Sequence, residues 1–559
     1  MTLTLTRKPE NRTHTLLIVA MWAALIVSVA LLFSKCFFGV TETQDEGYQA
    51  LNCLYYGDSP LGMLTFYIGN LAMRIFGNEL IVLRSLGCSC LLLSIAIPLI
   101  YFYRRTGNAL WTLWMAFFLV NFFCHNWMTH LIFSWDTCAY PFLSALVVCL
   151  MTYLDRPSGV KAATAGALCA ALILARITAV ASLPVMILAV IFAYPRSTRR
   201  WLRDSGIALL SFMLTAIVLI LIMKGSIAAY IASWSPDNII TGHDIRRESM
   251  KFFMASFRHD LTEWSIIASY SCQVLLVAAL TMLCCKFWPR RSGLIVGLTL
   301  LFFIVMQFLW RGNVTPGVYI VPLTMLAILC VISYCCKGLA KCDGIRLLLI
   351  IGFVLVPVVG SDRVFHRFGF FYCLPLLMYM IYRYKSQIFN RFLMLVMAYL
   401  MVSVFVYDIY DRIEKLDEGK LVHQDIPHHK LIYDYPHKWA ELRDAGDVVQ
   451  KLRREGVKFA FFGDGRYVME YSYNSQTPAH IQWFHYFVYK QVAQWVAAYT
   501  REQDAVFVHN IDSHSLTLSE VDSLFRTNGF VPVKRMNDYT LYMAENDTYS
   551  VQKLKTDKR

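Results

Sequence analysis

Two acidic residues, Asp45 and Glu46, stand side by side in the polar stretch that follows the first long apolar run of the chain. A carboxylate held near a membrane surface can act as a general base toward a hydroxyl or an amine. A solvated acid in a loop is also inexpensive, so Asp45 taken alone is equally well explained as ordinary surface polarity. The neighbouring residues are the evidence that distinguishes a catalytic acid from a surface acid.

A further acid and several arginines lie at or near the ends of other apolar runs. Asp136 lies in HLIFSWDTCAY, where an ionisable group is costly and is usually paired or functional. Arg84 and Arg176 lie within apolar runs, and two short polar breaks contain Arg311, Asn313, Asp362, Arg363, His366 and Arg367. Arginines at one membrane depth can hold and neutralise a phosphate. The alternative is that they extend to lipid headgroups from helix ends.

The composition assigns the chain to the membrane proteins. Of 559 residues, 57% are hydrophobic and only 16% are charged, whereas soluble domains carry about 25% charged residues. The apolar residues cluster in runs, many of the ~17–25 residues that a membrane-spanning helix needs. We therefore expect an α-helical polytopic membrane protein.

Thirteen apolar runs predict membrane-spanning helices. They cover residues 15–34, 80–103, 109–124, 128–153, 161–178, 179–194, 205–223, 264–285, 292–310, 314–336, 345–361, 367–382 and 390–407. The first run lacks a small-x-small cleavage site, so we expect an uncleaved helix and not a signal peptide.

Basic residues predict the orientation of these spans. The breaks on the side of the N-terminus hold 20 Lys/Arg and four acids, and the opposite breaks show no such excess. By the positive-inside rule, the N-terminus is cytoplasmic and the C-terminus lies outside the inner (plasma) membrane. Asp45, Glu46 and Asp136 then all lie at the outer face.

The chain changes character near residue 408, where the last apolar run ends. We predict a transmembrane domain over residues 1–408 and an extracytoplasmic α/β domain over residues 409–559. In the extracytoplasmic domain, the sequence pattern predicts helices over residues 447–456 and 518–529, strands over residues 457–463 and 504–510, and a hairpin over residues 531–545.

Two other classes of function find little support in the composition. The net charge of +14 does not indicate nucleic-acid binding, because the basic residues fall between spans and form no stripe interleaved with aromatics. The 16 cysteines show no metal-ligand spacing. Cys36 and Cys53 could pair, but buried small hydrophobes are the favoured interpretation.

An ordered set of residues follows the first span. It consists of Asp45–Glu46, Tyr48, Gly57–Asp58, Pro60, Phe76–Gly77 and Arg84. This order resembles the start of the GT-C superfamily of polyprenyl-phosphate-sugar-dependent glycosyltransferases, and it is most similar to lipid A aminoarabinose transferases and protein O-mannosyltransferases. Asp136 resembles the second acid of that family, and Arg363 with Tyr372 and Pro375 resembles a late basic–aromatic–proline segment. The chain departs at Ser59–Pro60–Leu61, where relatives often carry two prolines.

The resemblance implies a role for each of these residues. Asp45 would be the catalytic base, Glu46 would orient the site, and Asp136 would support it. The donor phosphate would be bound by Arg84, Arg176 and Arg363. The implied reaction inverts the anomeric carbon and moves a sugar from a polyprenyl-phosphate donor to a lipid, protein or glycan acceptor. No cofactor is required, although the three acids could hold a divalent cation.

Two alternatives stay open at this point. A transporter or flippase for a lipid-linked or polar solute would also need many spans, but its charged residues would tend to lie near the midplane and its spans to form inverted repeats. A non-catalytic assembly or sensor protein would use the C-terminal domain for binding. The grouping of charges at the outer face favours the glycosyltransferase.

Overall fold

The structure is a computed structural model of the chain. It describes residues 12–39, 44–57, 62–124, 132–194, 197–233, 273–309, 341–356, 375–380, 394–402, 419–463, 466–473, 489–509, 517–536 and 538–545, together with Phe392 and Val406. Arg363 and the predicted span 314–336 lie outside these residues, as does the side chain of Asp45.

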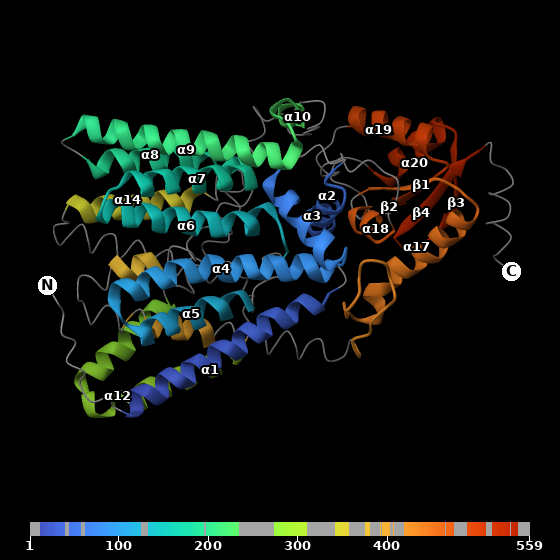
Figure 1. The fold of residues 1–559 in the computed structure, drawn as a ribbon. Helices are drawn as coiled ribbons and strands as arrows, with labels where there is room; N and C mark the ends of the chain where they lie inside the picture. The colour runs from blue at the N-terminus through green and yellow to red at the C-terminus, as the bar shows by residue number, and fades with distance from the viewer. Residues whose placement is uncertain are drawn as a thin grey trace.

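Apolar helices form a bundle, and a small sheet lies at one end of it (Figure 1). The labelled helices of the bundle are α1 (Arg12–Ser34), α4 (Leu80–Thr106), α5 (Ala109–Cys124), α6 (Trp135–Asp155), α7 (Gly159–Ala175), α8 (Ser182–Ala193), α9 (Thr198–Lys224), α12 (Ser292–Leu309) and α14 (Lys341–Leu355). Within the described residues, five helical segments are long and apolar enough to cross a membrane: Thr15–Phe37, Leu80–Thr106, Trp135–Asp155, Thr198–Lys224 and Pro289–Met306. The chain is an integral membrane protein, and the count of thirteen spans stays a prediction.

One predicted boundary is wrong for a clear physical reason. The span expected from residue 128 begins as α6 only at Trp135, because Ser134 and Thr137 form a capping box there. The Ser134 backbone N–H donates to Thr137 Oγ1 over 2.8 Å, and the Thr137 N–H donates back to Ser134 Oγ over 3.3 Å. Such a box satisfies N–H groups that a helix start leaves without partners. Asp136 therefore lies in the first turn of α6.

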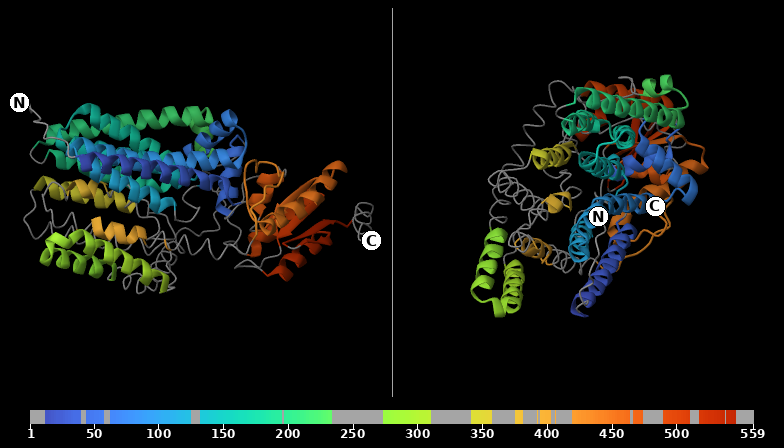
Figure 2. Two further views of the ribbon diagram at one scale, coloured as in Figure 1. Left: turned by 90° about the horizontal axis from the view of Figure 1, so that it is seen from below. Right: turned by 60° about the vertical axis from the view of Figure 1, so that its left-hand side comes forward.

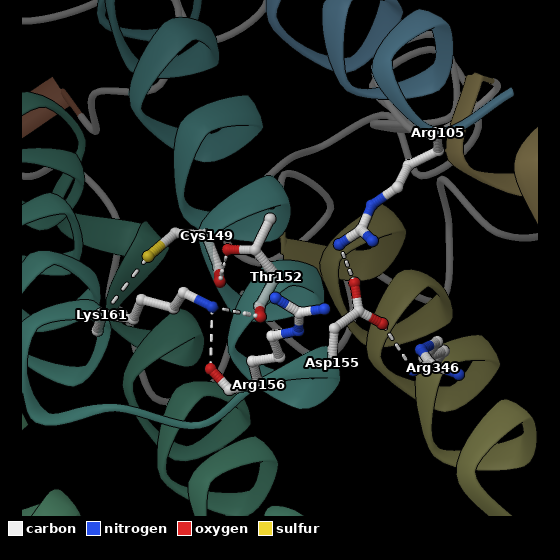
Figure 3. Close-up of polar contacts among 7 residues, drawn as sticks. All are labelled: Arg105, Cys149, Thr152, Asp155, Arg156, Lys161 and Arg346. Atoms are coloured by element: carbon white, nitrogen blue, oxygen red, sulfur yellow. Dashed lines mark hydrogen bonds and ion pairs between the residues drawn. The ribbon is translucent and has the colours of Figure 1, made fainter. Parts of the chain in front are cut away.

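The end of the bundle away from the sheet is joined by one carboxylate. Asp155, at the end of α6, accepts from Arg105 of α4 and, over 2.6 Å, from Arg346 of α14 (Figure 3). Nearby, Lys161 Nζ donates to the carbonyls of Thr152 and Arg156 at 2.8 and 2.7 Å. An ammonium at a helix C-terminus is favoured by the helix dipole. Asp155 thus joins α4, α6 and α14 at this end, and Lys161 joins α7 to the end of α6.

Asp155→Asn is expected to destabilise the bundle without abolishing chemistry at the other end. Removing one charge of a buried ion pair costs about 3–5 kcal/mol, and we expect the lower part of that range because the Arg105 side chain is 36% exposed. Thermal unfolding of the purified full chain measures the effect. Arg156→Gln serves as the control, since the interaction described for Arg156 is through its backbone carbonyl. A melting temperature equal to that of the unmutated chain would contradict the role given to Asp155.

Short helices cover the other end of the bundle. They are α2 (Gln44–Leu54), α3 (Leu64–Phe76) and α10 (Ile227–Ser233). In α3, Phe66 and Met73 are buried, whereas Ile75 and Phe76 are 63% and 73% exposed. A helix with one packed face and one exposed apolar face suits the surface of a membrane.

The C-terminal region, defined here as residues 419–545, contains the sheet. Its elements are α17 (Pro436–Arg454), β1 (Phe459–Phe462), α18 (Arg466–Tyr473), α19 (Tyr489–Glu502), β2 (Ala505–His509), α20 (Leu518–Thr527), β3 (Phe530–Arg535) and β4 (Tyr539–Ala544). The strand order is β1-β2-β4-β3, with β1 parallel to β2 and the other pairs antiparallel. The helices and strands predicted from the sequence in this region are confirmed.

Alternation along the strands explains how the sheet is covered. Phe459, Phe461 and Phe507 pack in a core with residues of α17, such as Trp439. Their sequence neighbours, such as Phe462, pack on the other face with α19 and α20. Successive strand residues point to opposite faces, so an uninterrupted apolar run indicates a sheet with helices on both sides. The boundary predicted at residue 408 stays a prediction, because residues 407–418 lie outside the described part of the chain.

Candidate active site

A buried ion pair joins the helix that carries the acidic residues to the bundle. Arg84 Nε donates to Glu46 Oε1 over 2.7 Å and Nη2 donates to Oε2 over 2.8 Å. The two side chains are only 2% and 4% exposed. A two-bond arginine–carboxylate contact fixes direction as well as distance. The pair therefore fixes the first turn of α2 against α4.

Arg84 also binds the chain just after the first span. Its Nη1 donates to the carbonyl of Phe38 over 2.9 Å and to that of Cys36 over 3.4 Å. All three guanidinium nitrogens are thus engaged with protein, on two segments: the first turn of α2 and the stretch just after α1. Arg84 was predicted to bind the donor phosphate; the contacts described here give it a second task, that of positioning Glu46. Cys36 and Cys53, considered above as a candidate disulfide, are both free thiols.

A second acid–arginine pair lies on neighbouring helices. Arg176 Nε is 3.0 Å from Asp136 Oδ1, and the side chains are 6% and 14% exposed. The helix α7 ends at Ala175 and a 3-10 helix (Ile177–Ala181) follows, so Arg176 stands at the break between these two helices. Thr65 of α3 donates to the Ala175 carbonyl over 2.9 Å. This bond holds α3 against the end of α7.

An aromatic contact connects the two pairs. Tyr48, two residues after Glu46, meets Trp135, the residue before Asp136, with ring centroids 6.0 Å apart and an interplanar angle of 70°. Edge-to-face contacts of this kind stabilise by about 0.5–1.5 kcal/mol beyond their burial. Tyr48 is buried, at 2% exposure. The first turns of α2 and α6 therefore lie together, which brings the predicted acids into one neighbourhood.

The remaining predicted residues are only partly placed. Asp45 lies in the first turn of α2, directly before Glu46, and its side chain is outside the described residues. Arg363 lies outside them altogether. Their roles stay predictions. Within the described residues no group of three or more His, Cys, Asp or Glu is arranged to hold a metal ion. The suggested divalent cation involves Asp45, so it too stays a prediction.

The C-terminal region contributes contacts that the sequence did not suggest. Tyr467 of α18 meets Tyr48 with ring centroids 5.4 Å apart. Tyr471 Oη donates over 2.9 Å to the carbonyl of Asn78, just before α4. Burial raises the pKa of Tyr471 well above its ordinary value, so this hydroxyl keeps its proton and remains a donor. One local signal existed: Gly47 follows the acids inside a helix, where glycine is unfavourable unless backbones approach closely.

Comparisons with known proteins were made on sequence and on structure. No known family matches the sequence, and no curated protein is similar to it. Among solved structures, the chain is similar to ArnT from Cupriavidus metallidurans bound to undecaprenyl phosphate. The identity is 13%, the TM-score is 0.42, and the alignment covers 94% of this chain and 97% of that one. These values do not assign the chain to a family.

Proposed function

We propose that this chain is an integral membrane glycosyltransferase that moves a sugar from a polyprenyl-phosphate donor to an acceptor at the outer face of the inner membrane. The observation that carries the proposal is the pair of buried contacts, Glu46–Arg84 and Asp136–Arg176, which lie beside the helix start bearing Asp45. Buried ionisable groups near a membrane surface are costly and are retained where they function. The ordered resemblance of residues 45–105 to GT-C glycosyltransferases supports the same activity.

The proposed reaction is a single displacement at the anomeric carbon. Asp45 accepts the proton of an acceptor hydroxyl or amine, whose oxygen or nitrogen forms a bond to that carbon. The bond from the anomeric carbon to the phosphate oxygen breaks, and the electron pair leaves with the polyprenyl phosphate. One displacement inverts the configuration. A positioned general base contributes about 10²–10⁴-fold to such a step.

Positive charge stabilises the departing phosphate. We assign this role first to Arg176, whose Nε lies 3.0 Å from Asp136 Oδ1 and whose guanidinium has two further nitrogens of the kind that donate to phosphate oxygens. Arg363 is the second candidate. Arg84 is assigned the positioning of Glu46, because its guanidinium already contacts Glu46 and two carbonyls.

Arg176→Gln is expected to raise KM for the donor about 10–100-fold, since a hydrogen bond to a charged group contributes about 1.5–3 kcal/mol. Initial rates of the reconstituted chain at varied donor concentration measure this. Arg74→Gln is the matched control, because Arg74 is exposed on α3 and should leave KM unchanged. An unaltered KM in the Arg176 variant would remove Arg176 from the donor site.

The proposed activity is tested in cells by comparing envelope molecules. Strains that lack the chain, and strains that express it or its Asp45→Asn variant, are compared by mass spectrometry of lipid A, glycoproteins and capsule. We expect one sugar to be absent without the chain, restored by the unmodified chain and not by the variant. Identical envelopes in all strains, with the chain inserted in the membrane, would overturn the proposal.

Transport is the alternative that this comparison also addresses. A transporter would move a solute or lipid across proteoliposomes without forming a sugar-modified product. The described ion pairs of the bundle favour transfer chemistry. Glu46 and Asp136, which pair with Arg84 and Arg176, are in the first turns of α2 and α6, and α2 lies at the end of the bundle that carries the sheet (Figure 1), whereas Asp155, which pairs with Arg346, is the last residue of α6. Transporter sites lie near the midplane.

A further inference from the structure

Helix α18 of the C-terminal region lies directly on the start of α2. A Cβ atom added to Gly47 would lie 2.7 Å from the backbone nitrogen of Val468 and 2.8 Å from the carbonyl carbon of Tyr467. Real Cβ atoms essentially never approach backbone atoms so closely. The two helices therefore meet backbone to backbone at the residue that follows Glu46, and only glycine allows this contact.

Aromatic rings extend the contact on both sides of α2. The Tyr48 ring lies between Tyr467 of α18, at 5.4 Å and 80°, and Trp135 of α6, at 6.0 Å and 70°. Trp135 precedes Asp136, and Tyr48 follows Glu46 by two residues. Tyr467 is buried, at 2% exposure, within the same apolar core as the bundle residues. A shift of α18 would thus be transmitted to both acid–arginine pairs.

The C-terminal region is also fixed to the ends of α1 and α4. The Leu80 backbone N–H donates to the His428 carbonyl over 2.9 Å, and His428 Nδ1 donates to the Asn78 carbonyl over 2.8 Å. The backbone of Tyr433 donates to Phe37 over 2.8 Å and accepts from Gly39 over 3.0 Å. These are the segments that flank Phe38 and Arg84. The C-terminal region therefore contacts each of the three segments that meet at Arg84.

We infer that α18 is a positioning element of the active site, which holds α2, and with it Asp45 and Glu46, against Arg84 and the start of α6. The inference rests on the proposed function for its kinetic consequence, and it assigns the C-terminal region a part in the site itself. The left-hand view of Figure 2 shows this region as a separate layer beyond the end of the bundle. The part that the C-terminal region plays in the active site would then depend on α18 and not only on the sheet of that region.

The test uses the full chain reconstituted in nanodiscs. Gly47→Ala inserts a methyl group between the helices, and Tyr467→Ala removes the ring without adding an atom. Gly206→Ala is the matched control, because Gly206 is also helical and a Cβ there meets nothing within 4 Å. Tyr467→Phe keeps the ring, so this variant should have the kcat and the hydrogen exchange of the unmodified chain.

Two measurements are made on each variant. Both test variants are expected to lower kcat about 10–100-fold while KM for the donor changes less than about twofold, because a displacement of about 1 Å near the reacting groups costs rate more than binding. Backbone hydrogen exchange over residues 44–54 should become faster, since local opening sets the rate of exchange. The control and Tyr467→Phe should change neither quantity.

The outcomes separate this inference from the proposed function. If Tyr467→Ala folds and leaves both kcat and the exchange of residues 44–54 unchanged, the positioning role of α18 is wrong. If the unmodified chain transfers no sugar from any polyprenyl-phosphate donor, the proposed function fails. Faster exchange over residues 44–54 in Tyr467→Ala would still support the contact in that case, because exchange does not depend on activity. If Gly47→Ala fails to fold, the result for Tyr467→Ala alone tests the positioning role of α18.

Discussion

Asp45→Asn is expected to lower kcat for sugar transfer about 10²–10⁴-fold while leaving insertion and stability unchanged. An amide has nearly the shape of a carboxyl group but cannot take the proton of the acceptor, and a positioned base contributes about this factor. KM for the donor should change little, because Asp45 is assigned to the acceptor and not to the phosphate. The measurement is the rate of sugar transfer by the reconstituted chain at saturating donor.

The matched control carries the same substitution at a remote site. Asp425 is exposed in the C-terminal region, so Asp425→Asn removes an acid of the same type without affecting the proposed reaction. A correctly inserted Asp45→Asn variant that transfers sugar at the unmodified rate would exclude Asp45 as the base. A variant that loses activity and also melts at a lower temperature would instead assign Asp45 to the structure.

Removal of Arg84 is expected to destabilise the chain and to abolish transfer. In Arg84→Met the Glu46 carboxylate would stay buried without its guanidinium partner, and breaking a buried pair in this way costs about 3–5 kcal/mol. Arg84→Lys keeps the charge but cannot form the two parallel bonds seen with Glu46. We expect an intermediate loss of stability for the lysine variant. Thermal unfolding and transfer rate are measured on each.

The double variant Glu46→Leu/Arg84→Met separates structure from chemistry. Replacing both members of a buried ion pair by apolar groups is often neutral for stability, so the melting temperature should recover most of what the single variant loses. Transfer should not recover, because α2 would lack the contact that directs its first turn. Recovery of both would mean that the pair is only structural. An Arg84→Lys variant with a raised KM for donor and an unchanged kcat would return Arg84 to the donor phosphate.

The sequence predicted a helical membrane bundle because membrane spans carry a strong and local signal. About 20 consecutive apolar residues can hardly be anything else, so Leu80–Thr106 was found with a small error at its end, whereas the start of Thr198–Lys224 was placed at residue 205. The helix α6 starts at Trp135 and not at the predicted residue 128, because the capping side chain of Ser134 fixes the helix start regardless of the apolar pattern. In the C-terminal region, alternating helix and strand patterns identified β1, β2 and the β3–β4 hairpin.

The candidate site residues were chosen by residue type and not by contact. Asp136 was selected because an ionisable group near an apolar run is costly, and Arg84 and Arg176 because arginines can hold a phosphate. Glu46 was selected through the resemblance. Nothing in their spacing showed which acid meets which arginine. Those pairs join residues 38 and 40 positions apart. The contact of α18 with Gly47 spans more than 400 residues of sequence, and a backbone-to-backbone contact leaves no pattern in the side chains. Only the glycine itself marked it.

We propose that this chain breaks the bond between a sugar and a polyprenyl phosphate. The most direct measurement supplies the reconstituted full chain with a polyprenyl-phosphate sugar, labelled in the sugar, together with an envelope extract as acceptor. We expect labelled acceptor and an equal amount of free polyprenyl phosphate, both lost in Asp45→Asn. Label that crosses the bilayer on intact donor, with no modified acceptor and no dependence on Asp45, would contradict it.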